Sequence, residues 1–311
     1  MTATAARPRL AWRPVDGILM LDKPVGLSSN QALQRARRLY RAAKGGHTGS
    51  LDPLASGVLP LCFGEATKVA GGLLDADKSY RATLSLGART ASGDRDGEVL
   101  ERQPVPVFEA AAVGRALDGF LGERLQVPPM YSALKQGGEA LYKLARRGVV
   151  VAREPRPIRI LSIEVVDFGM DWLTFDVSCS KGTYIRTLGE DIATALGTVG
   201  HLAALRRTAV GGALAGRPAH TFEALASRSG DEPALDALLL PVDAALAGLP
   251  ALTLDAAGVR AVRHGQPVAA AVAARAALRL YAPDGRFLGV GEADATGRQV
   301  RPTRLMRSDG N

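Results

Sequence analysis

The sequence predicts an α/β protein of the α+β type, with a mixed, largely antiparallel sheet, flanking helices and a small β-rich C-terminal module. Three observations lead to this prediction. Some segments alternate apolar and polar residues as strands do, others repeat apolar residues at helical spacing, and after residue 250 short apolar runs alternate with glycine-containing turns. A chain of 311 residues is long enough for one large domain and one small one.

Five segments of the first 200 residues predict strands and five predict helices. The predicted strands are 17–21, 58–63, 79–86, 158–167 and 173–180. One predicted helix starts at Ser28, where Gln31 completes a capping box. The other four cover 66–74, 108–121, 139–147 and 184–196. Residues 94–97 have the composition of a hairpin turn. No helix or strand is predicted for 202–205, which precede Arg206 and Arg207.

The domain organisation follows from changes of composition along the chain. Residues 1–14, rich in Ala and Arg, predict a disordered leader, and 15–249 the main domain. Within it, 126–154 have little apolar surface and predict an excursion from the core, while 227–233 are polar and linker-like. Residues 250–311 predict a separate module with a helix at 255–264 and strands at 277–281, 287–292 and 300–305.

The charge balance favours a polyanionic partner. The net charge is +8 and the isoelectric point about 9.8. Arg outnumbers Lys 32 to 7, which suits phosphate recognition but is also expected from a genome of biased base composition. From residue 251 onward nine Arg stand against four Asp and one Glu, so this segment alone contributes +4.

The cysteines, histidines and apolar runs predict no metal site and no membrane span. Cys62 and Cys179 lie far apart in apolar runs, which is typical of buried free thiols in a reducing compartment. The longest apolar stretch, 235–254, is interrupted by Pro241, Asp243 and Pro250. We therefore expect a soluble cytoplasmic protein.

The stretch from Gly45 to Lys68 is the strongest candidate site. Seven of its residues are Gly or Pro, and Pro53 restricts the backbone of Asp52 to extended geometry. One carboxylate is thus held among glycines that let a bulky ligand approach. The alternative is an ordinary Asp-Pro turn between two strands.

Other polar residues have functional interpretations, but taken singly each also has a structural one. Tyr80 begins the buried face of a strand, where its hydroxyl needs a partner. Arg186 lies in the first turn of a helix, where the dipole disfavours a cation, so we expect it to have a carboxylate or phosphate partner. Lys23 is equally a surface lysine, and Arg206 and Arg207 equally a solvated pair.

Six motifs in order resemble those of the TruB-type tRNA pseudouridine synthases. They are LDKPVG from Leu21, GGHTGSLDPLASGVLP followed by GEATK from Gly45, DKSY from Asp77, PPMYSALK from Pro128, SKGTYIR from Ser180 and LRR from Leu205. The resemblance covers 17–211 and is greatest to the branch that modifies uridine 55 in the TΨC loop of tRNA. One departure is Ser92, near which the family usually has a second Thr.

The resemblance implies an isomerisation that moves the glycosidic bond of uridine from N1 to C5 and needs neither cofactor nor metal. It implies that Asp52 is the catalytic nucleophile and that Arg186 is its partner, which would lower the pKa of the carboxylate and fix its orientation. The atom that Asp52 attacks stays open.

The resemblance also implies that the target base is flipped out of the tRNA loop into a central RNA-binding cleft. His47 would fill the vacated space, and Tyr80 would stack on the uracil with a possible part in proton transfer. Tyr184 and Leu205 would line the base pocket.

For the rest of the chain, the resemblance implies that Lys23 and Pro24 support the pocket. Residues 126–154 would contact the RNA, and 250–311 would form a PUA-like RNA-binding module. No protein partner and a monomer are expected. The alternative is a non-catalytic RNA-binding or tRNA-folding factor on the same scaffold.

Overall fold

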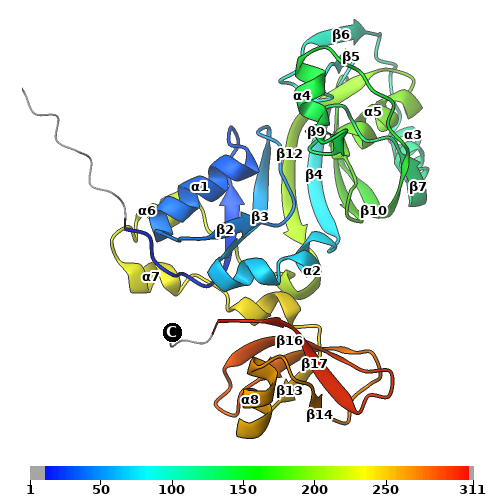
Figure 1. Cartoon of the computed structure of the whole chain (residues 1–311). Coiled ribbons are helices and arrows are strands. Elements are labelled where there is room, and N and C mark those ends of the chain that lie inside the picture. The colour runs from blue at the N-terminus through cyan, green and yellow to red at the C-terminus, as the bar shows by residue number, and fades with distance from the viewer. Residues whose placement is uncertain (1–10, 308–311) are drawn as a thin grey trace, which may run out of the picture.

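The computed structural model describes residues 11–307, which form a large domain on an eight-stranded sheet and a C-terminal module on a five-stranded sheet (Figure 1). The predicted α+β class is confirmed. Among these residues, no helix is long and apolar enough to cross a membrane.

The large sheet is antiparallel throughout, except where β12 joins β3. Its strand order is β1-β3-β12-β4-β11-β10-β7, with β2 beside β3. The bounds are β1 Gly17–Lys23, β2 Gly45–His47, β3 Ala55–Phe63, β4 Lys78–Leu86, β7 Gly122–Gln126, β10 Arg156–Phe168, β11 Trp172–Cys179 and β12 Gly200–Val210.

The parallel joint between β3 and β12 unites the two halves of the sheet. Leu205 pairs with Ala55 and Arg207 with Gly57. Gly57 has φ +103°, and a Cβ there would lie 2.1 Å from the carbonyl oxygen of Arg207. Only glycine permits this approach, so the joint that places β12 next to the Asp52 loop depends on Gly57.

Helices cover both halves of the sheet (Figure 1). Ser28 caps the first one with the predicted capping box. Around β1 and β3 lie α1 (Ser29–Tyr40), α6 (Phe222–Ala226) and α7 (Glu232–Asp236), whereas α3 (Ala110–Asp118) packs on β10 and α5 (Ile185–Ala195) on β12. Four short helices complete the domain: η1 (Gly64–Lys68) follows β3, α2 (Gly71–Leu74) follows η1, η2 (Gly212–Leu214) follows β12 and η3 (Val242–Leu246) follows α7.

Two small additions project from the right-hand half in Figure 1. One is the hairpin of β5 (Ala88–Thr90) and β6 (Val99–Arg102), whose tip contains the predicted turn. The other lies within the predicted excursion and comprises β8 (Lys135–Gln136), β9 (Glu139–Ala140) and α4 (Leu141–Arg146).

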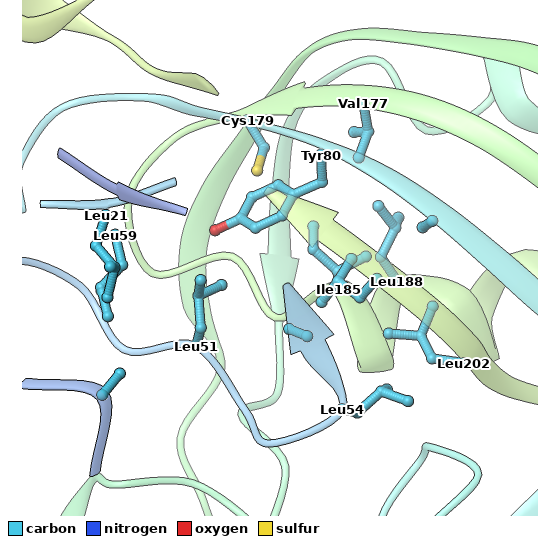
Figure 2. Packing of buried hydrophobic residues seen from close by; sticks show 14 of the residues in the cluster. Leu21, Leu51, Leu54, Leu59, Tyr80, Val177, Cys179, Ile185, Leu188 and Leu202 are labelled. Atoms are coloured by element: carbon cyan, nitrogen blue, oxygen red, sulfur yellow. The ribbon is translucent and has the colours of Figure 1, made fainter. Parts of the chain in front are cut away.

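The main core is aliphatic and lies against the sheet. Figure 2 shows part of it, with Tyr80 of β4 among Cys179, Leu51 and Ile185. The Tyr80 ring reaches away from its own strand, and its hydroxyl points toward the side of Leu51. The predicted alternation of β4 is confirmed, because Tyr80, Ala82, Leu84 and Leu86 are all buried.

The C-terminal module has a core of its own. Its strand order is β13-β15-β16-β17-β14. The bounds are β13 Ala251–Thr253, β14 Val268–Ala269, β15 Ala277–Tyr281, β16 Phe287–Ala293, β17 Gln299–Leu305 and α8 Ala256–Arg263.

The end of β17 and an arginine of β15 fasten the module to the large domain. Lys68 Nζ donates to Leu305 O (2.9 Å), and Arg307 N donates to Glu65 Oε2 (2.7 Å). Arg279 Nε donates to Leu249 O (2.9 Å).

Four predictions need correction. Residues 1–10 of the predicted leader lie outside the described residues, but Arg13 donates to Asp236 (2.6 Å) and so belongs to the folded domain. The predicted helix 66–74 is divided into η1 and α2 at residues 69–70, and Gly71 and Gly72, which begin α2, are poor helix formers. In the predicted helix 139–147, Glu139 pairs as a strand instead. The end of the linker-like segment starts α7, with Asp231 as its cap.

Candidate active site

Asp52 lies in the loop between β2 and β3, and both of its neighbours are anchored. Leu51 N donates to Ser29 Oγ (2.7 Å) at the start of α1. Gly26 N donates to Pro53 O (2.8 Å) from the loop after β1. The Asp52 side chain keeps 42% of its exposure. The carboxylate is therefore held at a fixed place and stays accessible from solvent.

Arg186 orients this carboxylate from the first turn of α5. Its side chain is only 5% exposed, and its Nε lies 2.9 Å from Asp52 Oδ2. Nη1 donates to Ser92 O (2.8 Å) in the β5–β6 hairpin, and Nη2 donates to Tyr131 O (2.7 Å) in the 126–154 excursion. One guanidinium thus links the Asp52 loop to two segments that are distant in sequence.

The pKa of Asp52 is raised above its ordinary value. Burial is the main cause, the nearby Asp94 adds to it, and Arg186 opposes both. Arg186 lowers the pKa of Asp52, as expected from the ion pair, but desolvation of the carboxylate outweighs this effect. Asp94 is held in place by Ser92, whose hydroxyl lies 2.6 Å from Asp94 Oδ1.

Tyr80 faces the site from β4 and has Arg207 as its partner on β12 in the sheet register. The Tyr80 side chain is buried, which raises its pKa, while the positive charge of Arg207 lowers it. Arg207 is 1% exposed, and its Nε donates to Val58 O (2.6 Å). This buried arginine was not predicted as a site residue.

His47 and Thr48 come just before Gly49, whose carbonyl oxygen accepts a hydrogen bond from Arg207. Burial and the charge of Arg207 lower the pKa of His47, so its imidazole is neutral at neutral pH. His47 Nδ1 and Thr48 Oγ1 are buried and have no hydrogen-bond partner within the described structure. Buried polar atoms without a hydrogen-bond partner are uncommon in folded proteins.

Tyr184 and Leu205 approach the site from α5 and β12. Tyr184 is the N-cap residue of α5, where its backbone N donates to Gln126 Oε1 (2.8 Å). Burial raises the pKa of its phenol, and the charge of Asp52 adds to the effect. Leu205 is 8% exposed and pairs with Ala55, three residues after Asp52.

Lys23 supports the loop after β1 from within. It is fully buried, and its Nζ donates to Pro24 O (2.9 Å) and Leu27 O (2.6 Å). Burial lowers its pKa to about 8, although Asp52 opposes this shift. Pro24 itself is exposed and contributes a carbonyl rather than a side-chain contact.

The predicted site residues therefore converge on the β3–β12 joint, and Pro24 lies at its edge. Two surface hollows of about 490 and 460 Å³ lie instead on or beside the C-terminal module and contain none of the site residues.

Within residues 11–307, no group of three or more His, Cys, Asp or Glu side chains is placed to hold a metal ion. An oriented, accessible carboxylate beside a buried phenol can carry out nucleophilic and proton-transfer chemistry.

Comparison with known proteins gives three family matches along the chain. Residues 37–185 match the N-terminal domain of the TruB family pseudouridylate synthases. Residues 186–247 match the tRNA pseudouridylate synthase B C-terminal domain, and 250–306 match the C-terminal domain described as pseudouridine synthase II TruB.

Curated relatives are similar over nearly their whole length. The tRNA pseudouridine synthase B of Burkholderia mallei (strain ATCC 23344) is 53% identical, with 98% of this chain and 99% of that protein covered. The protein of the same name from Dechloromonas aromatica (strain RCB) is 50% identical, with 96% and 97% covered.

Solved structures share the fold. A chain of a Cbf5–Nop10–Gar1 complex superposes with a TM-score of 0.69 at 24% identity, covering 98% of this chain and 91% of that one. A chain of the archaeal box H/ACA sRNP Nop10–Cbf5 complex gives 0.70 at 23% identity, covering 99% and 93%.

Proposed function

The chain belongs to the TruB family of pseudouridylate synthases and is therefore an isomerase, and we propose that its substrate is uridine 55 in the TΨC loop of tRNA. The observation that carries the proposal is the accessible Asp52 carboxylate, 2.9 Å from the buried Arg186. Relatives of 53% and 50% identity are named tRNA pseudouridine synthase B, which supports tRNA as the substrate class.

In the proposed reaction Asp52 acts as the nucleophile. The bond between N1 and C1′ breaks, and a bond between C1′ and C5 forms. The C5–H bond then breaks, its electron pair forms the C5=C6 double bond, and N1 takes up a proton. Atoms and electrons balance without a redox partner or water, so the reaction needs no cofactor. Arg186 keeps the carboxylate oriented and opposes the rise of its pKa.

The uridine reaches Asp52 by flipping out of the folded loop. His47 takes the place of the flipped base, and its unpaired Nδ1 supports this role. Tyr80 stacks on the uracil and participates in proton transfer at C5, while Tyr184 and Leu205 line the space for the base. Lys23 and Pro24 support the loop beneath it.

The wider RNA surface comprises the central cleft, the 126–154 excursion and the C-terminal module of residues 250–311, which we propose to be PUA-like. The contacts of Arg186 support the assignment of the excursion to the RNA surface, because Arg186 bonds both to Tyr131 of the excursion and to Asp52. We propose that the enzyme acts as a monomer in the cytoplasm, where its tRNA substrate is found.

The direct test is incubation with unmodified tRNA followed by mapping of pseudouridine, with a tRNA carrying C instead of U at position 55 as the control. Asp52→Ala should lower the single-turnover rate by roughly 10⁴-fold or more, the scale expected for loss of a nucleophile, and leave tRNA binding intact.

Each outcome separates the proposal from its alternatives. A loss of turnover in Asp52→Ala that is much smaller than about 10⁴-fold contradicts the nucleophile role, and loss of tRNA binding makes Asp52 structural. A wild-type protein that binds tRNA without forming pseudouridine is a non-catalytic RNA-binding or tRNA-folding factor.

A further inference from the structure

Arg206 and Arg207 are neighbours on β12 with opposite environments. Arg206 is exposed, and its Nη2 donates to Asp22 Oδ2 (2.7 Å). Arg207 is among the largest fully buried side chains of the protein. Its Nε donates to Val58 O, and its Nη2 donates to Gly49 O (3.3 Å) in the loop that carries Asp52.

Arg207 forms no ion pair with any carboxylate in the described part of the chain. The titratable groups that interact electrostatically with Arg207 are instead basic or phenolic. Its charge lowers the pKa of Lys23, His47 and Lys78, and Tyr80 raises the pKa of Arg207 itself. Burial of a cation without a carboxylate partner is unfavourable, because the charge loses its hydration. Tyr80 is the residue that pairs with Arg207 across the β12–β4 ladder, and a Tyr80 phenolate would neutralise the buried charge.

Tyr80 needs such a partner if it is to accept a proton. A neutral phenol is a poor base, and the burial of Tyr80 favours the neutral form. Among the described residues around Tyr80, Arg207 supplies the permanent positive charge, and its fork to Gly49 and Val58 fixes where that charge lies.

We propose that Arg207 is a positioning residue of the proposed isomerase: it holds the Tyr80 hydroxyl in a fixed relation to the Asp52 loop and stabilises the Tyr80 phenolate that accepts the C5 proton. The inference rests on the proposed function. In this step the C5–H bond breaks, the proton passes to the phenolate oxygen, and N1 takes up a proton from solvent. Arg207 touches no reacting atom and acts through Tyr80.

The test measures single-turnover pseudouridine formation on tRNA containing uridine with hydrogen or deuterium at C5. Arg207→Gln should lower the rate about 10- to 100-fold and increase the isotope effect at C5, because the proton-transfer step becomes slower. The tRNA dissociation constant should stay within about threefold. Arg206→Gln is the matched control and should leave both the rate and the isotope effect unchanged.

A double-mutant cycle shows whether Arg207 acts through Tyr80. In a Tyr80→Phe background, Arg207→Gln should cost less than about a further threefold, because the group it acts on is already gone. Additive losses, or a slower rate with an unchanged isotope effect, overturn the inference.

A second variant covers the case in which Arg207→Gln does not fold. Arg207→Lys keeps the buried charge and loses the fork, so it should be slowed less and still show an increased isotope effect. An unchanged isotope effect in this folded variant also overturns the inference. Failure of the proposed function looks different, because the wild-type protein would then form no pseudouridine at all.

Discussion

The basic residues of the large domain's site and those of the C-terminal module occupy opposite environments. At the site, Lys23, Arg186 and Arg207 are buried and bonded to specific oxygen atoms. In the described part of the module, every arginine except Arg279 is exposed. Buried cations set the pKa values and orientations of neighbouring groups, whereas exposed ones act through a field that salt screens.

This difference predicts a division of labour between the two regions. Changes at the site should alter the rate of the chemical step and leave RNA affinity nearly constant. Changes in the module should alter affinity and its salt dependence and leave the rate at saturation constant.

Among the basic residues of the two regions, the largest effect is expected at Arg186. Arg186→Gln removes the charge beside Asp52 and should lower the single-turnover rate about 10²- to 10³-fold. Because Arg186 opposes the rise of the Asp52 pKa, its loss should raise that pKa further and move the acid limb of the rate profile to higher pH. Part of the lost rate should therefore return as the pH is raised.

The control for Arg186→Gln is Arg206→Gln, which removes an exposed arginine paired with Asp22. It should change neither the rate nor the pH profile. A loss in Arg186→Gln that is equal at every pH would mean that Arg186 serves only as a structural clamp between the Asp52 loop, Ser92 and Tyr131.

A smaller effect is expected from the module. Replacing Arg260, Arg263 and Arg304 together with Gln should weaken tRNA binding about tenfold at moderate salt. The slope of log K against log salt should fall by about one for each phosphate that is no longer neutralised.

The control for the module variant is a second triple variant that removes the same charge from the large domain. It replaces three solvent-accessible arginines that pair with carboxylates, Arg41, Arg81 and Arg89. Equal losses of affinity in both triple variants would mean that only net charge matters.

The sequence predicted those features of the site that depend on local pattern. The capping box at Ser28, the alternation that buries Tyr80 and the restriction of Asp52 by Pro53 involve residues only a few positions apart. For Arg186 the local pattern indicated only that a carboxylate or phosphate partner was needed, and the resemblance to the TruB-type enzymes named Asp52 as that partner.

Arg207 could not be found in this way, because β12 does not alternate regularly. Its ladder with β4 shifts register between Leu202 and Ala204 and again between Arg207 and Ala209. The buried positions therefore fall at Gly200, Leu202, Leu205, Arg207 and Val210, a spacing that matches neither a regular strand nor a helix. The raised pKa of Asp52 was also unpredictable, since it depends on packing and on Asp94, which the fold brings close.

The smallest predicted effect is on the stability of the folded protein. It tests whether burial of a cation at the site lowers the free energy of unfolding. The pKa of Lys23 is lowered to about 8 by burial, from 10.5. Between these two values the unfolded chain binds the proton and the folded protein does not, so folding becomes more favourable as the pH rises. The free energy of unfolding of the wild type, relative to that of Lys23→Met, should therefore increase by about 1 kcal/mol from pH 7 to pH 9. Denaturant unfolding of both proteins at the two pH values measures this difference. A difference that stays constant would mean that Lys23 is well solvated, and the contrast between buried site cations and exposed module cations would not extend to it.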